Sequence, residues 1–322
     1  MRYRPLGRTG WQVSDVGFGA WGIGGKQWRA DNDDQSIAAL RRAIELGVNF
    51  IDTALAYGDG KSEELVGEVV RTTKSEVLVA TKVPPENRIW PARPEFPIGD
   101  VFPYDYIVAS TEESLRNLGL ERIDLQQLHV WTPEWTARDE WKRAAEDLKK
   151  AGKIRAFGIS VTEHEPDTVL DALRTGLIDA VQVIYNIFDQ TPETNLFPLC
   201  QELNIGVLAR VPLDEGALTG AITEDTDLSG DEFRSWYFRG DRKRQVVEHV
   251  VPLQKELEGE PGTLAENALR FVLSHPAVST VIPGMRRPRT VESSVSVSDR
   301  GPLRPDLLAR LKRHAWYRSF YC

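Results

Sequence analysis

Four ionisable side chains follow three consecutive apolar runs of this sequence. Asp52 ends the first run, Tyr57 follows it in the next loop, and Lys82 and His129 stand at the ends of the next two runs. If these runs are neighbouring parallel strands, which lie about 4.8 Å apart, their carboxyl ends bring the four groups to one place. Phenol, ammonium, carboxylate and imidazole groups are those that enzymes use for proton transfer, so the conjunction indicates a catalytic pocket.

Each of the four residues also has a structural explanation when taken alone. Asp52 could cap a helix or a turn, His129 could be a core histidine, and Tyr57 is ordinary in a loop. Lys82 could reach solvent along its aliphatic stem, although a buried barrel strand is a poor place for an idle ammonium. The coincidence of all four at one end of three strands favours the catalytic interpretation.

The elements that would position these groups alternate along the chain. Short β-rich runs predict strands, and segments with apolar residues three or four apart predict helices. The predicted strands are 15–19, 49–53, 77–83, 123–129, 156–160, 180–185, 205–210 and 279–282. The predicted helices are 33–46, 62–72, 104–118, 138–151, 167–174, 194–203 and 263–274.

Strands joined by helical crossovers pair in parallel, and eight of them can close a barrel without an open edge. We therefore expect an α/β fold, a (β/α)8 TIM barrel in which residues 1–322 form a single domain; a doubly wound open sheet is the alternative. A β-hairpin is expected over 3–14. Two segments interrupt the alternation, a proline-rich loop over 89–102 and a long polar loop over 216–262 after the seventh strand.

Composition excludes several classes of protein. The formal net charge of −8 disfavours a nucleic-acid partner, which would need a basic face. No run approaches the roughly 20 apolar residues of a membrane span, and residues 1–5 do not fit a secretion signal. Cys200 and Cys322 cannot form a disulfide framework, and the five histidines are too scattered for a metal site. We expect a cytoplasmic protein that holds no metal.

Two adjacent motifs carry a resemblance to a known family. Phe50-Ile51-Asp52-Thr53-Ala54-Leu55-Ala56-Tyr57-Gly58 and Ser62-Glu63-Glu64-Leu65-Val66-Gly67 resemble the signature of the aldo-keto reductases, and Lys82 and His129 occupy the family's next two catalytic positions. Later motifs follow in order, around 151–160, 182–186, 212–220 and 282–284. The resemblance covers nearly the whole chain and is closest to the bacterial-type enzymes, a branch related to the potassium-channel β subunits.

The resemblance implies an oxidoreductase that reduces aldehyde or ketone carbonyls with NADPH. Tyr57 would be the general acid, and His129 would donate a hydrogen bond to the substrate oxygen. Asp52 would hold Lys82 charged and aimed at the phenol, where an ammonium lowers the pKa of Tyr57. The partner would be a small-molecule carbonyl substrate; the sequence does not specify it or the oligomeric state.

The resemblance also implies which residues contact the cofactor, NADPH or NADP. They are Gly19, Trp21, Asp52, Ser160, Gln182, Arg210, Pro212, Leu213, Gly216, Gly284, Arg286, Thr290 and Ser294. Ser160 and Gln182 would bind the nicotinamide carboxamide. Arg210 stands where the family usually has an aromatic ring stacked on the nicotinamide, and its charge would favour NADPH over the cationic NADP⁺.

Arginines indicate the phosphate contacts. Arg286, Arg287 and Arg289 precede a predicted short helix, and arginines beside a helix N-terminus suit a 2′-phosphate, which favours NADP over NAD. A solvated basic turn is the alternative. Four more arginines in the long loop could clamp the pyrophosphate: Arg234, Arg239, Arg242 and Arg244. The chain departs from the family pattern at Val161, Thr290 and Ser294, and at Asp214 and Glu215, whose carboxylates would lie near the pyrophosphate.

Three further interpretations need a structural answer. The G-x-G-x-x-G pattern at 17–22 does not open a helix and is therefore not expected to cradle a pyrophosphate. An NADPH-binding regulatory subunit with little turnover is the main functional alternative, and a barrel isomerase or metal-dependent hydrolase is another. An aromatic pocket could be formed by Trp21, Trp28, Trp90 and Trp131, and the segment 316–321 could dock on the barrel.

Overall fold

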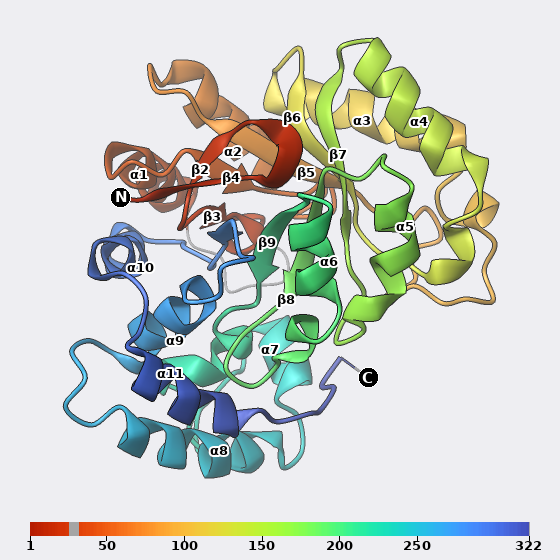
Figure 1. Ribbon diagram of the computed structural model, residues 1–322. Helices are drawn as coiled ribbons and strands as arrows, with labels where there is room; N and C mark the ends of the chain where they lie inside the picture. Colours follow the sequence, from red (N-terminus) through yellow and green to blue (C-terminus); the bar gives the residue numbers. More distant parts are fainter. Residues whose placement is uncertain (26–31, 322) are drawn as a thin grey trace.

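The computed structural model describes residues 1–25 and 32–321, which wind around a central barrel (Figure 1). Its 8-stranded sheet pairs in parallel throughout, in the order of the strands along the chain. The strands are β3 Phe18–Gly19, β4 Phe50–Asp52, β5 Leu78–Val83, β6 Ile123–Leu128, β7 Ile154–Ser160, β8 Ala180–Ile184, β9 Gly206–Arg210 and β10 Thr280–Val281. Trp28 belongs to the predicted aromatic pocket but lies outside the described residues.

The first and last strands of the sheet also meet. Val16 bridges in parallel to Val281, and Gly19 bridges to Gly284. The backbone is so close at this seam that a Cβ on Gly19 would lie 2.7 Å from the carbonyl oxygen of Ile282. The predicted TIM barrel is therefore confirmed, and the open sheet is excluded.

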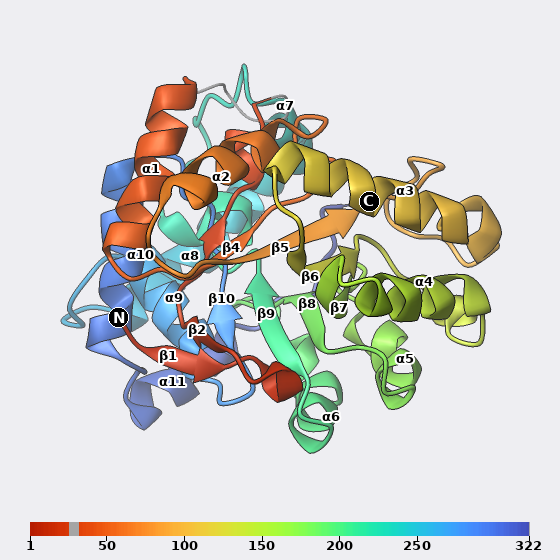
Figure 2. The same ribbon diagram turned by 90° about the horizontal axis from the view of Figure 1, so that it is seen from above.

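Helices cover the outside of the barrel (Figure 2). They are α1 Asp33–Glu45, α2 Lys61–Thr72, α3 Tyr104–Leu118, α4 Asp139–Lys150, α5 Leu170–Arg174, α6 Leu196–Glu202, α9 Leu264–Leu273, α10 Pro288–Arg300 and α11 Pro305–Leu311. α3 has the predicted bounds, because Pro103 precedes it and Gly119, at a φ of 62°, ends it. α10 spans 13 residues and is longer than the short helix expected after the arginines.

An apolar plug fills the amino-terminal end of the barrel. The predicted hairpin is present, with β1 Tyr3–Pro5 and β2 Gln12–Ser14 paired antiparallel. Leu6 and Val13 from the hairpin segment are buried with residues of the strands. The other members of this cluster are Phe50, Leu78, Ala80, Leu125, Ala156, Ala180, Leu208 and Ile282. Because the plug is apolar, the polar side chains inside the barrel are confined to the other end, where the strands finish.

The prediction of a long polar loop over 216–262 is corrected by the structure, because the segment contains two α-helices. They are α7 Glu232–Tyr237 and α8 Arg242–Glu256. α8 buries Val246, Val250 and Leu253, which share one helical face. α8 lies at the bottom of Figure 1, beside α11. Only three of the five apolar residues of α8 other than proline are buried, and Pro252 within the helix weakens the helical pattern.

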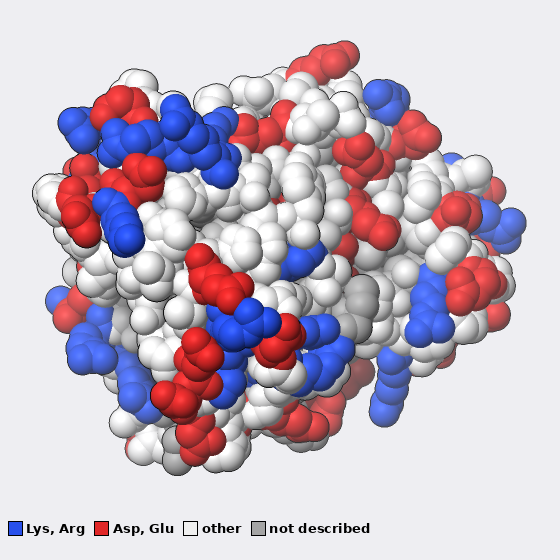
Figure 3. Space-filling model, turned by 90° about the horizontal axis from the view of Figure 1, so that it is seen from below, with Lys and Arg blue, Asp and Glu red and all other residues white. Residues whose placement is uncertain are grey.

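Acidic and basic side chains are interspersed on the face seen in Figure 3. Many of them pair with one another, as Arg244 does with Glu248 and Arg310 with Glu256. Within residues 1–25 and 32–321, no helix combines the length and the apolar character that crossing a membrane requires.

The contact between α2 and α3 gives a test of the packing. A Cβ on Gly67 of α2 would lie 2.2 Å from the carbonyl oxygen of Leu118. We expect Gly67→Ala to lower the free energy of unfolding by about 1–3 kcal/mol, because the added methyl group overpacks this contact. The matched control is Gly99→Ala, whose Cβ would meet its nearest atom at 4.0 Å. Urea denaturation measures both, and a Gly67→Ala protein as stable as the wild type would contradict the packing.

Candidate active site

A buried ammonium lies at the floor of the barrel mouth. Lys82, on β5, has no exposed surface, and its Nζ donates to Asp52 Oδ2 at 2.6 Å. The same Nζ donates to the Thr53 carbonyl oxygen at 2.8 Å and to Tyr57 Oη at 3.3 Å. Burial acts to lower the pKa of Lys82, but the charges of Asp52 and Tyr57 outweigh it and raise this pKa, so the amine stays charged.

Side chains from three other strands donate hydrogen bonds to the Asp52 carboxylate. Besides Lys82, its carboxylate accepts hydrogen bonds at Oδ1 from Gln182 Nε2 on β8 at 2.7 Å and from Gln127 Nε2 on β6 at 3.3 Å. The family resemblance assigns Gln182 to the nicotinamide carboxamide, yet its amide donates here to Asp52. The buried carboxylate therefore has partners on both oxygens, as a buried charge requires.

Tyr57 follows β4 and brings its hydroxyl within reach of Lys82. The pKa of Tyr57 is raised, first because burial disfavours the phenolate; Lys82 acts in the opposite direction. The expected lowering by the ammonium is therefore present but does not decide the direction. A raised pKa keeps the phenol protonated at neutral pH, so the group remains a proton donor.

His129 stands beside the phenol at the end of β6. Its ring centroid lies 5.6 Å from that of Tyr57 and 4.5 Å from that of Trp90. Burial, followed by the charges of Lys82 and Arg210, holds the pKa of His129 well below its usual value. The imidazole is therefore neutral, and a neutral imidazole carries one N–H that can donate to a substrate oxygen.

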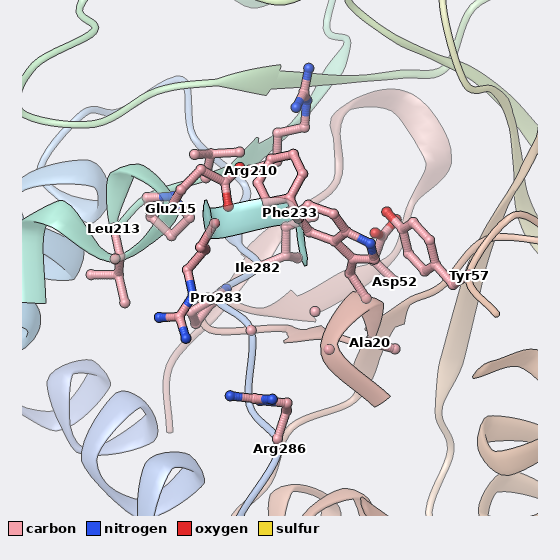
Figure 4. Close-up of a pocket in the computed structure, with 18 of the residues that line it drawn as sticks. Ala20, Asp52, Tyr57, Arg210, Leu213, Glu215, Phe233, Ile282, Pro283 and Arg286 are labelled. Carbon is pink, nitrogen blue, oxygen red and sulfur yellow. The ribbon is translucent and has the colours of Figure 1, made fainter. Parts of the chain in front are cut away.

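A cavity of about 740 Å³ opens above these side chains, within the usual size of a ligand pocket. Tyr57 and Asp52 lie at one end of the close-up and Leu213 and Glu215 at the other, with Phe233 between them (Figure 4). Of the predicted cofactor residues, the cavity is lined by Gly19, Trp21, Asp52, Ser160, Gln182, Arg210, Pro212, Leu213, Gly216, Gly284, Arg286 and Thr290. Ser294 is buried in α10 and is not among the lining residues.

Of the seven arginines predicted to bind phosphate groups, four line the cavity and three do not. Arg234 lines the cavity, as do Arg286, Arg287 and Arg289 near the N-terminus of α10. Of the others, Arg242 donates to the Tyr237 and Phe320 carbonyl oxygens, Arg244 pairs with Asp241 and Glu248, and Arg239 covers the Trp236 ring. None of these three lines the cavity in the described chain.

The predicted aromatic pocket is partly correct. Trp21 and Trp90 line the cavity, whereas Trp131 is buried in the core against Trp135 and Trp141. Its place is taken by aromatic side chains that the sequence does not single out, Phe233 and Trp236 of α7 and Tyr321. Tyr321 shows that the segment 316–321 does dock at the barrel mouth.

Arg210 and Glu163 form a partly buried pair at the wall of the cavity. Arg210 Nη2 donates to Glu163 Oε1 at 3.3 Å and to the Val161 carbonyl oxygen at 3.1 Å. Burial opposes the charge of Arg210, but Glu163 and further acidic groups raise its pKa, so it stays charged. Its buried Nε has no hydrogen-bond partner within residues 1–25 and 32–321, which leaves a donor for a ligand.

Metal ligands do not gather in the described part of the chain. No group of three or more histidine, cysteine or acidic side chains there is arranged to hold an ion. The pattern at 17–22 contains β3 and the start of a short 3₁₀ turn, Trp21–Ile23, and no α-helix opens on it, as expected.

Comparison with known proteins agrees with the geometry. A profile of the Aldo/keto reductase family matches residues 15–315. The NADH-specific methylglyoxal reductase of Escherichia coli (strain K12) is 30% identical over 308 residues, which cover 92% of this chain and 93% of that one. The glycerol dehydrogenase of Gluconobacter oxydans has a TM-score of 0.80 at 29% identity, covering 97% of this chain and 94% of that chain.

A third relative was solved with ligands. An aldo/keto reductase from Klebsiella pneumoniae, in complex with NADP and acetate, has a TM-score of 0.70 at 25% identity and covers 99% of this chain and 98% of that chain. The chain therefore belongs to the aldo/keto reductase family. Membership supports an oxidoreductase that acts on small carbonyl compounds.

The buried ion pair gives a prediction for stability. Lys82→Met leaves the Asp52 carboxylate buried without its cation, so we expect the free energy of unfolding to fall by about 3–5 kcal/mol. The double variant Asp52→Asn/Lys82→Met removes both charges and should recover most of the loss. Urea denaturation of the three proteins decides the matter. Equal stability of Lys82→Met and the wild type would show that the Asp52 carboxylate does not need the Lys82 ammonium in the folded protein.

Proposed function

We propose that the protein reduces the carbonyl group of small aldehydes or ketones to an alcohol with NADPH, and that Tyr57 is the general acid. The observation that carries this proposal is the position of Tyr57 Oη, 3.3 Å from a fully buried and charged Lys82 at the floor of a ligand-sized cavity. No simpler structural role explains a lysine with no exposed surface whose partners are a carboxylate, a carbonyl oxygen and a phenol.

The cavity fits a nicotinamide dinucleotide in three respects. The backbone is open at Gly284, where an added Cβ would meet no atom within 4 Å. Arg210 presents its unpartnered Nε within the described chain, and arginines gather at the N-terminus of α10. The last feature favours a 2′-phosphate and therefore NADP. A relative described as NADH-specific shows that the family includes both preferences, so cofactor choice needs its own measurement.

Each catalytic side chain then has one task. The cavity residues would hold NADPH, which when bound would supply the hydride for the carbonyl carbon. Tyr57 gives its proton to the carbonyl oxygen, which completes the alcohol, and Lys82 stabilises the phenolate that remains until solvent returns the proton. His129, neutral in this environment, donates a hydrogen bond to the same oxygen and orients it. Asp52 keeps Lys82 charged and fixed in place.

Replacement of Tyr57 by phenylalanine tests the proposed proton donor. Tyr57→Phe keeps the ring but not the hydroxyl, so we expect kcat to fall by about 10²–10⁴-fold while the Kd for NADPH stays nearly unchanged. NADPH oxidation across a panel of aldehydes and ketones measures the first quantity, and tryptophan fluorescence measures the second. The exposed Tyr317→Phe is the matched control and should change neither.

The same experiment separates the enzyme from an NADPH-binding regulatory subunit. If neither the wild type nor Tyr57→Phe turns over any carbonyl of the panel, yet the wild type binds NADPH, the regulatory interpretation is correct. A wild type that does turn over, with the same kcat in Tyr57→Phe, would instead reject the role of the phenol.

A further prediction concerns the affinity of the protein for the reduced and the oxidised cofactor. If the Arg210 guanidinium stacks on the nicotinamide, its charge disfavours the cationic ring, so NADPH should bind about two- to fivefold more tightly than NADP⁺. Glu163 offsets part of this charge and keeps the effect modest. Arg210→Gln should remove the difference. Fluorescence titrations that give equal affinities for the wild type would show that Arg210 does not lie against the ring.

A further inference from the structure

We propose that Glu215 couples dinucleotide binding to the uptake of one proton, and that Tyr321 sets the pH at which this occurs. The proposal rests on the proposed function, because it requires a dinucleotide in the cavity. It concerns a carboxyl group that lines the ligand cavity and that lacks a salt-bridge partner within the described chain.

Glu215 lies beside Leu213, at the end of the cavity away from Tyr57 and Asp52 (Figure 4). Arg234 lines the cavity near the same place, because a Cβ on Gly216 would lie 3.6 Å from its Nη1. A dinucleotide with its nicotinamide at the catalytic end has to place its diphosphate further along the cavity, where Arg234 is a cation that can receive it. We therefore infer that phosphate charges come close to the Glu215 carboxyl.

The two neighbouring carboxyl groups are treated differently by the fold. Asp214 forms a buried salt bridge with Arg318, and Tyr237 Oη donates to it at 3.5 Å. Glu215 forms no salt bridge within residues 1–25 and 32–321; its Oε1 accepts a hydrogen bond from the neutral Tyr321 Oη at 2.5 Å. Asp214 thus has a cation as its direct partner, whereas the direct partner of Glu215 is an uncharged hydroxyl group.

The surroundings make Glu215 easy to protonate. Burial raises its pKa to about 7, with a smaller contribution in the same direction from Asp214. The Tyr321 hydrogen bond and the charges of Arg210 and Arg234 act the other way. A diphosphate beside the carboxylate would raise this pKa further, because like charges favour the neutral acid.

The segment 316–321 keeps this arrangement in place. The Trp316 N–H donates to the Phe188 carbonyl oxygen at 2.8 Å, and Arg242 donates to the Phe320 carbonyl oxygen at 2.8 Å. Phe320 is buried, and Tyr321 packs against the rings of Phe233 and Tyr237. Tyr321 is therefore a positioning residue that acts through Glu215.

The sign of the pH dependence follows from linkage. Below about pH 7 the Glu215 carboxyl is already protonated and binding needs no further proton; above it, each bound dinucleotide must take one up. The Kd for NADP⁺ should therefore rise about tenfold between pH 6 and pH 8 relative to a protein without this group. The 2′-phosphate also titrates near pH 6, so the comparison with a variant is essential.

The experiment is titration calorimetry of the full-length protein with NADP⁺ at pH 8, in two buffers of different ionisation enthalpy, with tryptophan fluorescence for Kd from pH 6 to pH 8. The wild type should take up close to one more proton than Glu215→Gln, whose amide imitates the neutral acid. Glu215→Gln should bind about as tightly as the wild type at pH 6 and about tenfold more tightly at pH 8. Glu258→Gln, which removes an exposed carboxylate that does not line the cavity, is the control and should retain the proton uptake.

Tyr321→Phe tests the second half of the proposal. Loss of the hydrogen bond removes a contribution that lowers the pKa of Glu215, so the midpoint of the pH dependence should move upwards. A purely structural role for Tyr321 would change Kd by the same factor at every pH. Equal proton uptake in the wild type and Glu215→Gln overturns the inference while leaving the proposed function intact. No NADP⁺ or NADPH binding at any pH overturns both.

Discussion

The buried ion pair between Lys82 and Asp52 is the constraint on which the rest of the site depends. A charge without solvent is costly unless each of its hydrogen-bonding positions is satisfied, and the partners of this pair come from different strands, with Gln127 on β6 and Gln182 on β8. They meet only if the strands keep their register and the barrel is closed. The apolar plug at the other end packs residues of the same strands together, so the site depends on the packing of the whole barrel.

Burial of the site also explains why the proton donor is protonated before a reaction starts. Burial raises the pKa of Tyr57 and lowers that of His129, so both groups are neutral and each carries a hydrogen to donate. The effect of Lys82 on the pKa of the resting phenol is outweighed by burial, but its fixed charge lies where a phenolate would form. Stabilisation of this kind acts on the state that follows proton transfer rather than on the resting state, which is what a catalytic acid requires.

The sequence is informative where local periodicity and tertiary structure agree. The strands, the bounds of α3 and the approach of Tyr57 to Lys82 follow from strand ends, helix stops and a family motif. It fails where contacts join distant segments. α8 escapes prediction because its buried face has only three apolar residues, and Trp131 packs in the core although its position in sequence favours the pocket. Tyr321 lies 106 residues from Glu215 in sequence, and no spacing rule connects such positions.

The two carboxyl groups at 214 and 215, which depart from the family pattern, make sense only together with the segment 316–321. Asp214 without Arg318 would be an unpaired buried charge, and Glu215 without Tyr321 would lose its hydrogen-bond donor. Compensation therefore operates between two stretches that are far apart in the chain but adjacent at the barrel mouth. Because Arg318 pairs with only one of the two carboxyl groups, the other stays at the edge of the ligand cavity without a salt bridge in the described chain.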